Sequence, residues 1–243
     1  MYFIVKRTFD IFFSFLAILF LTPIWFPIII LLMLTGEHLV FYFQKRIGKG
    51  GELFGVWKFV TMITNSVNIG TGSVTTVNDP RVLPVGKFLR KSKLNELPQL
   101  INILIGNMSF IGPRPLLKCD FDAYSTEAQQ KVIQSKPGLS GIGSIVFRDE
   151  EVIVSKANEP ISFFMNVIQP FKGELEIWYY YNRSISVDFK IIILTIMGVF
   201  FPKSEFVYKV FSTLPKIDFE KELFDFNQSH MKDVKKEHVS FKV

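Results

Sequence analysis

Three charged residues in the middle of the chain are of types suited to phosphate chemistry. Glu96 lies near the start of an expected helix, Arg90 precedes it, and Arg114 lies in a Gly-Pro-Arg-Pro turn stiffened by two prolines. A guanidinium group is a fork of donors that matches phosphate oxygens, and a helix N-terminus carries partial positive charge. An acid among such groups could hold a divalent metal that bridges a diphosphate. The pattern therefore suggests phosphoryl chemistry.

The helix that would position Glu96 follows from apolar spacing. Leucine and isoleucine recur with helical periodicity at Leu94, Leu97, Leu100, Ile101 and Leu104. Pro98 is tolerated only in a first turn, so the helix is expected to begin near Asn95. The same residues also have plain structural explanations. Asn95 would be an ordinary N-cap and Glu96 an ordinary partner of the helix dipole, Arg90 and Arg114 would contact lipid headgroups, and Lys58 would lie exposed on a strand.

A long apolar segment precedes this region. Ile11 to Leu34 carries no charged residue and is long enough to span a bilayer. Thr22-Pro23 interrupts its middle, Pro27 follows, and proline kinks or ends a helix. Basic pairs flank both ends, which favours a cytoplasmic location for both. We expect a re-entrant helix-break-helix, and the alternative is a single span with a proline kink. The segment is too long for a cleavable signal peptide.

Composition restricts the partners. Between Gly36 and Lys118, seven lysines and four arginines face four acidic residues, so this region's net charge of +7 exceeds the +6 of the whole chain. Such placement suits anionic headgroups or a phosphorylated substrate, and the apolar anchor disfavours nucleic acid. The 27 phenylalanines predict further helices at the membrane surface. Cys119 is the only cysteine, which excludes an intramolecular disulfide, and the three histidines lack metal-ligand spacing.

Other segments give a coarse outline of the domain. Residues 39–43 and 53–57 are β-prone and flank a glycine-rich turn at 48–51, which predicts a hairpin. Residues 66–76 have a loop composition. A helix is expected over 126–134, and the apolar segment 191–201 should be buried or interfacial. We divide the chain into a membrane segment at 1–35, a domain on the cytoplasmic face at 36–204 and a charged tail at 205–243.

Several ordered motifs match a known family. Lys6-Arg7-Thr8-Phe9-Asp10 looks like a membrane-anchoring Lys-Arg-x-x-Asp motif, and Thr22-Pro23 stands where the family usually has Ser-Pro. The most specific match is Met108-Ser109-Phe110-Ile111-Gly112-Pro113-Arg114-Pro115. The others are Trp57-Lys58-Phe59-Val60-Thr61-Met62, Asn78-Asp79-Pro80-Arg81, Gly86-Lys87-Phe88-Leu89-Arg90, Leu94-Asn95-Glu96-Leu97-Pro98-Gln99-Leu100 and Lys136-Pro137-Gly138-Leu139-Ser140-Gly141. From about Lys6 to about Val199 the chain resembles the bacterial sugar transferases, the monotopic phosphoglycosyl transferases.

The resemblance implies a fold, a reaction and a location. The fold is an α+β monotopic membrane protein with a re-entrant helix, interfacial amphipathic helices and a small β-hairpin. The reaction transfers a sugar 1-phosphate from a UDP-sugar to undecaprenyl phosphate with Mg²⁺ as cofactor, and it releases UMP. It begins exopolysaccharide, O-antigen, capsule or glycoprotein glycan assembly on the cytoplasmic face of the bacterial inner membrane. The expected partners are membrane lipids and downstream glycosyltransferases, with no nucleic acid, and the sequence leaves open whether the chain forms a homodimer.

The chain departs from the family at the expected nucleophile. The family's Asp-Glu dyad corresponds here to Asn95 and Glu96, and an amide is not a competent phosphoryl nucleophile. Either Glu96 is the nucleophile, or the lipid phosphate attacks directly while Glu96 holds the metal, or the chain is a non-catalytic relative that binds lipid phosphate or nucleotide sugar. Arg148, a further expected phosphate ligand, is followed by Asp149-Glu150-Glu151, where the family has neutral residues. Those acids could replace the lost charge, or form a solvated turn.

Overall fold

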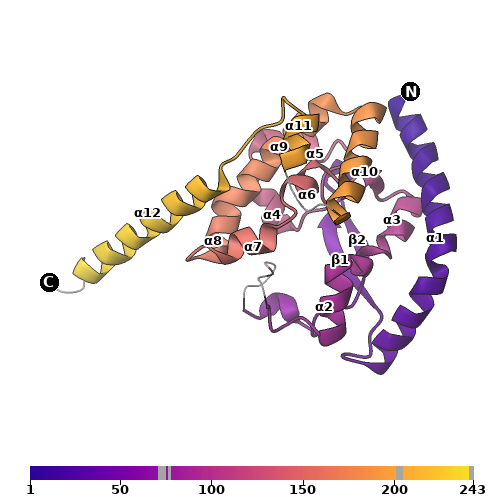
Figure 1. Cartoon of the computed structure of the whole chain (residues 1–243), viewed down its shortest axis with the longest axis horizontal. Helices are drawn as coiled ribbons and strands as arrows, with labels where there is room; N and C mark the ends of the chain where they lie inside the picture. The colour runs from indigo at the N-terminus through magenta and orange to yellow at the C-terminus, as the bar shows by residue number, and fades with distance from the viewer. Residues whose placement is uncertain (71–74, 76–77, 201–204, 241–243) are drawn as a thin grey trace.

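The computed structural model of the chain describes residues 1–70, 75, 78–200 and 205–240, without the side chains of 67, 199, 200, 205 and 230–240. Helices surround two small sheets, and a long N-terminal helix lies along one side of the body (Figure 1). The strands are β1 (Phe41–Ile47), β2 (Leu53–Phe59), β3 (Ser109–Ile111) and β4 (Gly138–Ser140). The α-helices are α1 (Tyr2–Leu34), α2 (Pro84–Lys91), α3 (Gln99–Ile105), α4 (Lys118–Asp122), α5 (Thr126–Val132), α6 (Ile142–Val146), α7 (Glu150–Ser155), α8 (Pro160–Phe163), α9 (Gln169–Asn182), α10 (Ile185–Phe200), α11 (Glu205–Val210) and α12 (Phe219–Ser240). Short turns of other helix types are η1 (Lys49–Gly51), η2 (Ser66–Asn68), η3 (Leu94–Glu96) and η4 (Phe164–Ile168).

The N-terminal motif attaches α1 to the rest of the protein. Lys6 forms an ion pair with Asp188 of α10 at 2.5 Å. Arg7 donates to the carbonyl oxygens of Ile103 and Leu104 at 2.6 and 2.8 Å, which caps the C-terminal end of α3 with a cation. The buried carboxylate of Asp10 accepts from the Ser109 hydroxyl and the Phe110 backbone N–H at 3.1 and 3.0 Å. The three residues predicted to anchor the chain in the membrane therefore also bind the helix to three other elements.

The expected break in this segment is not an end of the helix. The α1 helix continues through Pro23 and Pro27, and it curves around the body (Figure 1). The Thr22 hydroxyl donates to the carbonyl oxygen of Ile18 at 2.7 Å, a back-bond that bends helices without ending them. The correction is therefore from helix-break-helix to a single bent helix. It is the one helix among the described residues that is long and apolar enough to cross a membrane.

The predicted hairpin is confirmed, with longer strands than the sequence suggested. β1 and β2 pair antiparallel from Phe41 opposite Phe59 to Ile47 opposite Leu53. Asn102 of α3 fixes this hairpin to the helix. Its fully buried side chain accepts from the Trp57 N–H at 2.9 Å and donates to the Gly55 carbonyl at 2.8 Å. The contact holds the segment before α3 against the strand that carries Lys58.

Two of the sequence motifs meet backbone to backbone. β3 and β4 form a short parallel pair, with Ser109 opposite Gly138. A Cβ on Gly112 would lie 2.4 Å from the Lys136 carbonyl oxygen, and one on Gly138 would lie 2.2 Å from the Gly112 nitrogen. No side chain fits at either distance, which explains the glycines in the Gly-Pro-Arg-Pro and Lys-Pro-Gly segments. This contact fixes the turn that carries Arg114.

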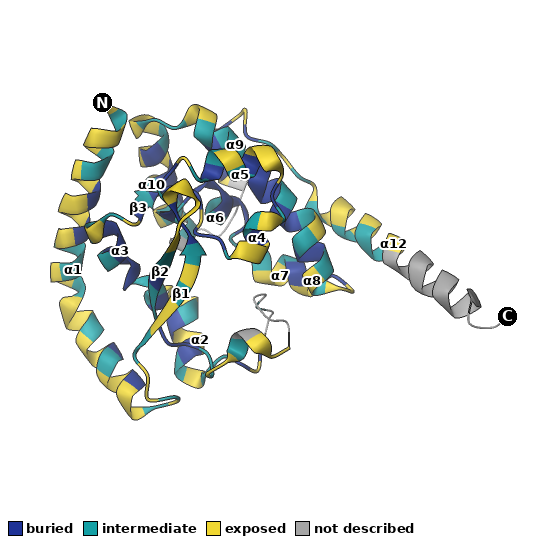
Figure 2. Ribbon diagram, turned by 180° about the vertical axis from the view of Figure 1, so that it is seen from behind, coloured by how far each residue is buried: buried dark blue, intermediate teal, exposed yellow. Residues whose placement is uncertain are grey.

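The other helices complete the body. The largest apolar cluster is built mainly on α6, α9 and α10, and smaller ones lie under α1, α3 and α5. Figure 2 shows that α1 is exposed along its outer side. The helix expected at 126–134 is confirmed as α5, and the apolar segment expected at 191–201 belongs to the longer α10. Within the loop expected at 66–76, residues 66–68 form the short turn η2, and residues 71–74 and 76 lie outside the described residues, as does Phe201. In the tail, Phe219 packs its ring on Phe147 at 5.2 Å, and α12 then extends away from the body (Figure 1).

We predict that Asn102→Ala destabilises the protein more than Asn107→Ala, a change at an exposed asparagine a turn later. The first removes the partner of a part-buried N–H and of a part-buried carbonyl of β2, and the cost is up to about 1–3 kcal/mol for each group that water does not reach. Thermal unfolding in detergent would measure the difference. Equal melting temperatures for the two variants would contradict the role given to Asn102.

Candidate active site

Four of the predicted site residues come together around one carboxylate. Oε1 of Glu96 lies 3.7 Å from a guanidinium nitrogen of Arg114. Lys58 on β2, Arg90 near the end of α2 and Lys93 add positive charge around the same carboxylate. The Glu96 side chain is 18% exposed and that of Arg114 is 44% exposed. The cluster is therefore partly open to solvent and carries more positive than negative charge.

The electrostatics of the cluster favour an ionised Glu96. Burial acts to raise the pKa of Glu96, but Arg114, Lys58 and the other cations overcome it, and the pKa lies below its usual value. Lys58 is affected in the opposite sense. Burial, reinforced by Arg46, lowers the pKa of Lys58 to about 7. A phosphate placed beside Lys58 would favour its charged form.

The segment around Glu96 differs from the expected helix start. Residues Leu94–Glu96 form the tight turn η3, which follows Lys93 in a left-handed conformation with φ of 59°. α3 begins only at Gln99, after Pro98, and has no side-chain cap. The interpretation of Asn95 as an N-cap is therefore wrong. Its side chain is buried, and its Oδ1 has no hydrogen-bond partner among the described residues.

Glu176 supports the turn that carries Arg114. This residue of α9 is buried, with 3% exposure. The backbone N–H of Arg114 donates to its carboxyl group. Burial raises the pKa of Glu176 to about 8, so the group is largely protonated at neutral pH. Periodicity gave no sign of this burial, because α9 is polar and aromatic on several sides.

The acidic residues after Arg148 bind cations of the site. Glu151 lies 3.0 Å from the Arg90 guanidinium, and Glu150 forms an ion pair with Lys172 of α9. These contacts favour the interpretation in which the acids add negative charge to the site over that of a solvated turn. Arg148 itself does not join Arg114. Its guanidinium packs on α10, where a Cβ added to Gly198 would lie 2.0 Å from it.

Sequence reasoning missed Arg46 as part of this site, because the residue was read as a flank of the membrane segment. Arg46 donates to the Pro115 carbonyl oxygen at 3.3 Å and lies 3.8 Å from the carboxylate of Asp120. Burial, with Arg114 as the next cause, lowers the pKa of Arg46 to about 10. The guanidinium therefore binds the Gly-Pro-Arg-Pro turn at the residue after Arg114. Its position beside the β-prone run was the available signal.

The residues of the site would suit a metal ion that takes most of its ligands from the substrate phosphates. Among the described residues no three His, Cys, Asp or Glu side chains form a metal-binding group. Mg²⁺ in phosphate-handling sites commonly needs only one or two carboxylates beside the substrate oxygens. Glu96 offers one such carboxylate, and the unpartnered Oδ1 of Asn95 is a neutral oxygen on the adjacent residue. This donor set suits magnesium better than zinc, which prefers nitrogen and sulfur ligands.

Comparisons with known proteins agree with the motifs. A family model described as bacterial sugar transferase matches residues 1–202. Exopolysaccharide production protein ExoY of Sinorhizobium fredii is 32% identical over 208 residues, which cover 80% of this chain and 84% of that protein. The UDP-glucose:undecaprenyl-phosphate glucose-1-phosphate transferase of Escherichia coli is 32% identical over 206 residues, 84% of this chain and 42% of that protein. The undecaprenyl-phosphate galactose phosphotransferase of Salmonella typhimurium is 31% identical over 60% of this chain and 33% of its own length. The chain thus spans under half of these two transferases.

We predict that Glu176→Gln flattens the dependence of stability on pH. A carboxyl whose pKa is about 8 in the folded protein and about 4.3 when unfolded holds its proton more tightly in the folded state. Its contribution to stability is therefore lost as the pH rises through this interval. Glutamine keeps an acceptor for the Arg114 N–H and does not titrate. Between pH 5 and 9 the wild-type melting temperature should fall more than that of the variant.

Glu174→Gln is the matched control, because Glu174 is exposed on the same helix. The control should follow the wild-type curve. If the Glu176 variant follows it as well, the carboxyl does not titrate in the folded state as described.

Proposed function

The chain belongs to the bacterial sugar transferase family, and we propose that it transfers a sugar 1-phosphate from a UDP-sugar to undecaprenyl phosphate. The observation that carries this proposal is the ionised carboxylate of Glu96, held 3.7 Å from Arg114 with Lys58 and Arg90 beside it. The donor diphosphate and the acceptor phosphate are both anions, and the cluster offers cations for both. The named relatives differ in the sugar that they transfer, so the sugar of this chain is a question for a substrate panel.

Phosphate recognition would use the cations of the cluster. Arg114 and Arg90 present forked donors, and Lys58 would gain charge as a phosphate approaches. Glu151 now lies against Arg90 at a place that a substrate phosphate would compete for. Because Glu151 is 52% exposed, its displacement requires little desolvation.

The bond changes leave two routes open. An oxygen nucleophile attacks the phosphorus that carries the sugar, the bond from this phosphorus to the UMP oxygen breaks, and UMP leaves. In one route Glu96 is the nucleophile and forms an acyl phosphate. The undecaprenyl phosphate oxygen then attacks the same phosphorus, the bond from phosphorus to the Glu96 oxygen breaks, and the free carboxylate is restored. In the other route the lipid phosphate attacks directly. Asn95 has no role as a nucleophile in either, because its amide nitrogen and oxygen are weakly nucleophilic.

Glu96 is also the residue that would hold Mg²⁺ together with the substrate phosphates. The bound ion would neutralise negative charge on the phosphoryl oxygens. Glu96 would serve as sole protein carboxylate in the direct route, and Asn95 would supply at most a neutral oxygen.

The packing of α1 supports a monotopic arrangement. Its 33 residues rise about 50 Å at 1.5 Å each, yet both ends contact the same body. Lys6 binds α10 near the start, and Ile28 and Leu32 pack with Phe59 and Leu89 near the end. A straight span would place one of these ends, with its partners, across the bilayer. We therefore propose that α1 enters and leaves the same side, the cytoplasmic face of the bacterial inner membrane.

A second exposed apolar surface adds to this arrangement. Large apolar side chains of α10 face outward at Ile185, Phe189, Ile193, Ile196 and Met197. α10 and α1 are therefore two helices with exposed apolar faces, and they lie on neighbouring parts of the molecule (Figure 1). Helices at a membrane surface are expected to have such faces. The lipid-linked product would then be available to downstream glycosyltransferases at the same face.

We predict that both ends of α1 lie on the cytoplasmic side. In a Cys119→Ser background, Ile4→Cys and Lys45→Cys place single exposed thiols near each end. Neither should react with an impermeant maleimide outside intact cells, and both should react after permeabilisation. External labelling of position 4 alone would establish a single span and refute the re-entrant path.

We predict that Glu96→Gln lowers UMP release from UDP-sugars by at least about 100-fold, because it removes the only carboxylate of η3. A 100-fold loss corresponds to about 2.7 kcal/mol, which is near the top of the roughly 1.5–3 kcal/mol expected for one charge-assisted contact. A still larger loss is expected if Glu96 also attacks phosphorus. Glu52→Gln, at an exposed acid of the hairpin turn, should leave the rate unchanged. Asn95→Ala should be milder than Glu96→Gln. Turnover by Glu96→Gln equal to that of the control would remove Glu96 from the chemistry.

The same assay separates the mechanisms. A stoichiometric burst of UMP without undecaprenyl phosphate would indicate a covalent intermediate on Glu96. No UMP without the lipid, with turnover in its presence, would indicate direct attack. If the wild type turns over no UDP-sugar while Asn95→Asp does, the chain is a non-catalytic relative and our proposal fails.

A further inference from the structure

A small basic pocket lies at the first turns of α1, apart from the Glu96 cluster. It has a volume of about 80 Å³. Five basic side chains line it, and none of the four cluster residues described above does. These five are Lys6, Arg7, Lys49, Lys136 and Arg183. They come from α1, the hairpin turn, the segment before β4 and the end of α9, so the fold brings together four distant parts of the sequence.

Three of the five cations have partners within the protein. Lys6 pairs with Asp188, and Arg7 donates to two carbonyl oxygens. Arg183 donates to the Ser135 hydroxyl at 2.6 Å and lies over the Tyr180 ring at 4.2 Å. Only the first of these partners is an anion. The hydrogen-bond partners of Arg7 and Arg183 are neutral, and Asp10 is the carboxylate that lies close enough to attract Arg7.

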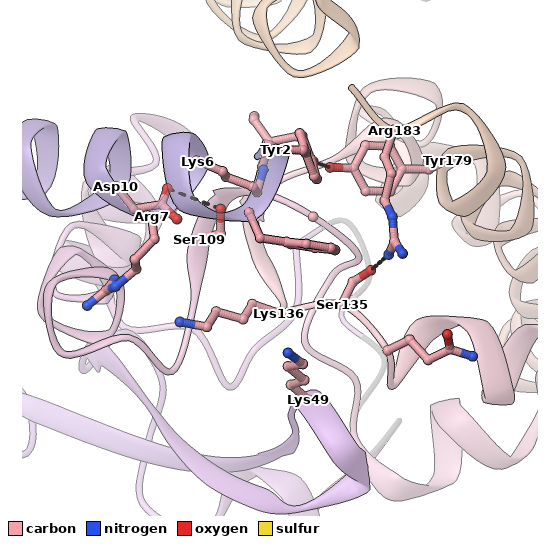
Figure 3. A pocket seen from close by; sticks show the side chains of 14 residues that line it. Tyr2, Lys6, Arg7, Asp10, Lys49, Ser109, Ser135, Lys136, Tyr179 and Arg183 are labelled. Atoms are coloured by element: carbon pink, nitrogen blue, oxygen red, sulfur yellow. Dashed lines mark hydrogen bonds between the residues drawn. The ribbon is translucent and has the colours of Figure 1, made fainter. Parts of the chain in front are cut away.

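Lys49 and Lys136 have neither a hydrogen bond nor an ion pair among the described residues. Both side chains extend into the pocket, and Lys49 reaches toward Lys136 (Figure 3). The acid that lines the pocket is Asp10, whose carboxylate already binds Ser109 and Phe110. The pocket thus has an excess of positive charge that its own acids do not balance.

Arg7 and Lys136 both approach Gly106, the residue after α3. A Cβ built on Gly106 would lie 3.1 Å from Arg7 Nη2 and 3.3 Å from Lys136 Nζ. Gly106 follows α3 with φ of 99°, a left-handed conformation that glycine adopts readily. Because glycine has no side chain, the ends of both cationic side chains can come close to its backbone. Partial burial, reinforced by Arg7 and Lys49, lowers the pKa of Lys136. A bound anion would relieve this repulsion.

The surroundings of the pocket indicate where the anion comes from. Phe3 lines it and is 56% exposed, and the neighbouring Ile4 is 74% exposed. The mouth therefore combines lysines with exposed apolar side chains on the helix that we place in the membrane. This combination matches the boundary between headgroups and acyl chains, where basic residues meet lipid phosphates.

We propose that this basic pocket binds the phosphate headgroup of an anionic phospholipid, and that the contact holds the first turns of α1 at the membrane surface. The proposal rests on the membrane location of α1, and it is independent of the catalytic reaction.

The test is lysine footprinting of the full chain in nanodiscs, read by peptide mass spectrometry. Acetylation of Lys49 and Lys136 should be about fivefold slower in discs that contain phosphatidylglycerol than in pure phosphatidylcholine. That factor corresponds to the ~1 kcal/mol that one lysine gains at an anionic surface. Lys156, at the end of α7, and Lys221, on α12, are exposed and serve as internal controls that should not change. Both helices lie across the body from α1 (Figure 1).

A Lys136→Gln variant separates pocket binding from general surface charge. Removal of one headgroup ligand should abolish the protection of Lys49 if the pocket binds the lipid. Protection of Lys49 that persists in this variant would overturn the proposal, as would unchanged acetylation of both lysines in the wild type.

Two further arms identify the source of the phosphate, each in phosphatidylcholine discs. Inorganic phosphate should give no protection at the concentration of headgroups used. Equal protection by inorganic phosphate would replace the lipid with a soluble anion. Protection by undecaprenyl phosphate but not by phosphatidylglycerol would make the pocket an acceptor site and overturn the assignment to a phospholipid.

Discussion

The backbone contact between Gly112 and the segment before β4 is the constraint on which both sites depend. No Cβ would fit on Gly112 or on Gly138, so the two chain segments lie at a distance that only glycine permits. Gly112 lines the basic pocket, and two residues later Arg114 meets Glu96. One short parallel pair therefore determines the geometry of the charged cluster and of the pocket. Arg46 and Glu176 hold the same turn through its backbone, which leaves the Arg114 side chain available for a ligand.

Positive charge exceeds negative charge in both the Glu96 cluster and the basic pocket. Without a ligand the cations repel one another, and this repulsion explains several contacts with carboxylates. Like charges at short distance destabilise a folded protein. Glu96 beside Arg114, Glu151 beside Arg90 and Glu150 beside Lys172 offset part of this repulsion. These pairs are partly exposed, so each contributes little to stability and gives way to a stronger anion. The arrangement is suited to exchanging the protein's own carboxylates for phosphates.

Local patterns predicted much of this, and tertiary contacts explain what they missed. Motif order placed Glu96, Arg90, Arg114 and Lys58 in one site, and alternation with turn residues predicted the hairpin. The tight turn before α3 was missed because Pro98 is compatible with a first helical turn, and only packing shows that the helix begins after it. The burial of Glu176 and the contact of Arg148 with Gly198 depend on how α9 and α10 pack, which periodicity does not encode. A proline predicted a break in α1, yet a hydroxyl back-bond and a continuous apolar environment permit a bend instead.

The amide at position 95 has a physical consequence apart from its weak nucleophilicity. An aspartate there would put a second, buried carboxylate next to Glu96, and two such groups raise each other's pKa. With Asn95 in place, Glu96 is the one carboxylate of its turn, and the surrounding cations keep its pKa below the usual value. The cost is a buried amide oxygen that finds no hydrogen-bond partner within the described part of the chain, about 1–3 kcal/mol where no donor or cation satisfies it. An unsatisfied acceptor beside an ionised carboxylate favours the binding of a cation or a hydrogen-bond donor. With asparagine instead of aspartate at position 95, the turn therefore offers one acid and one neutral oxygen ligand, where it would otherwise offer two interacting acids.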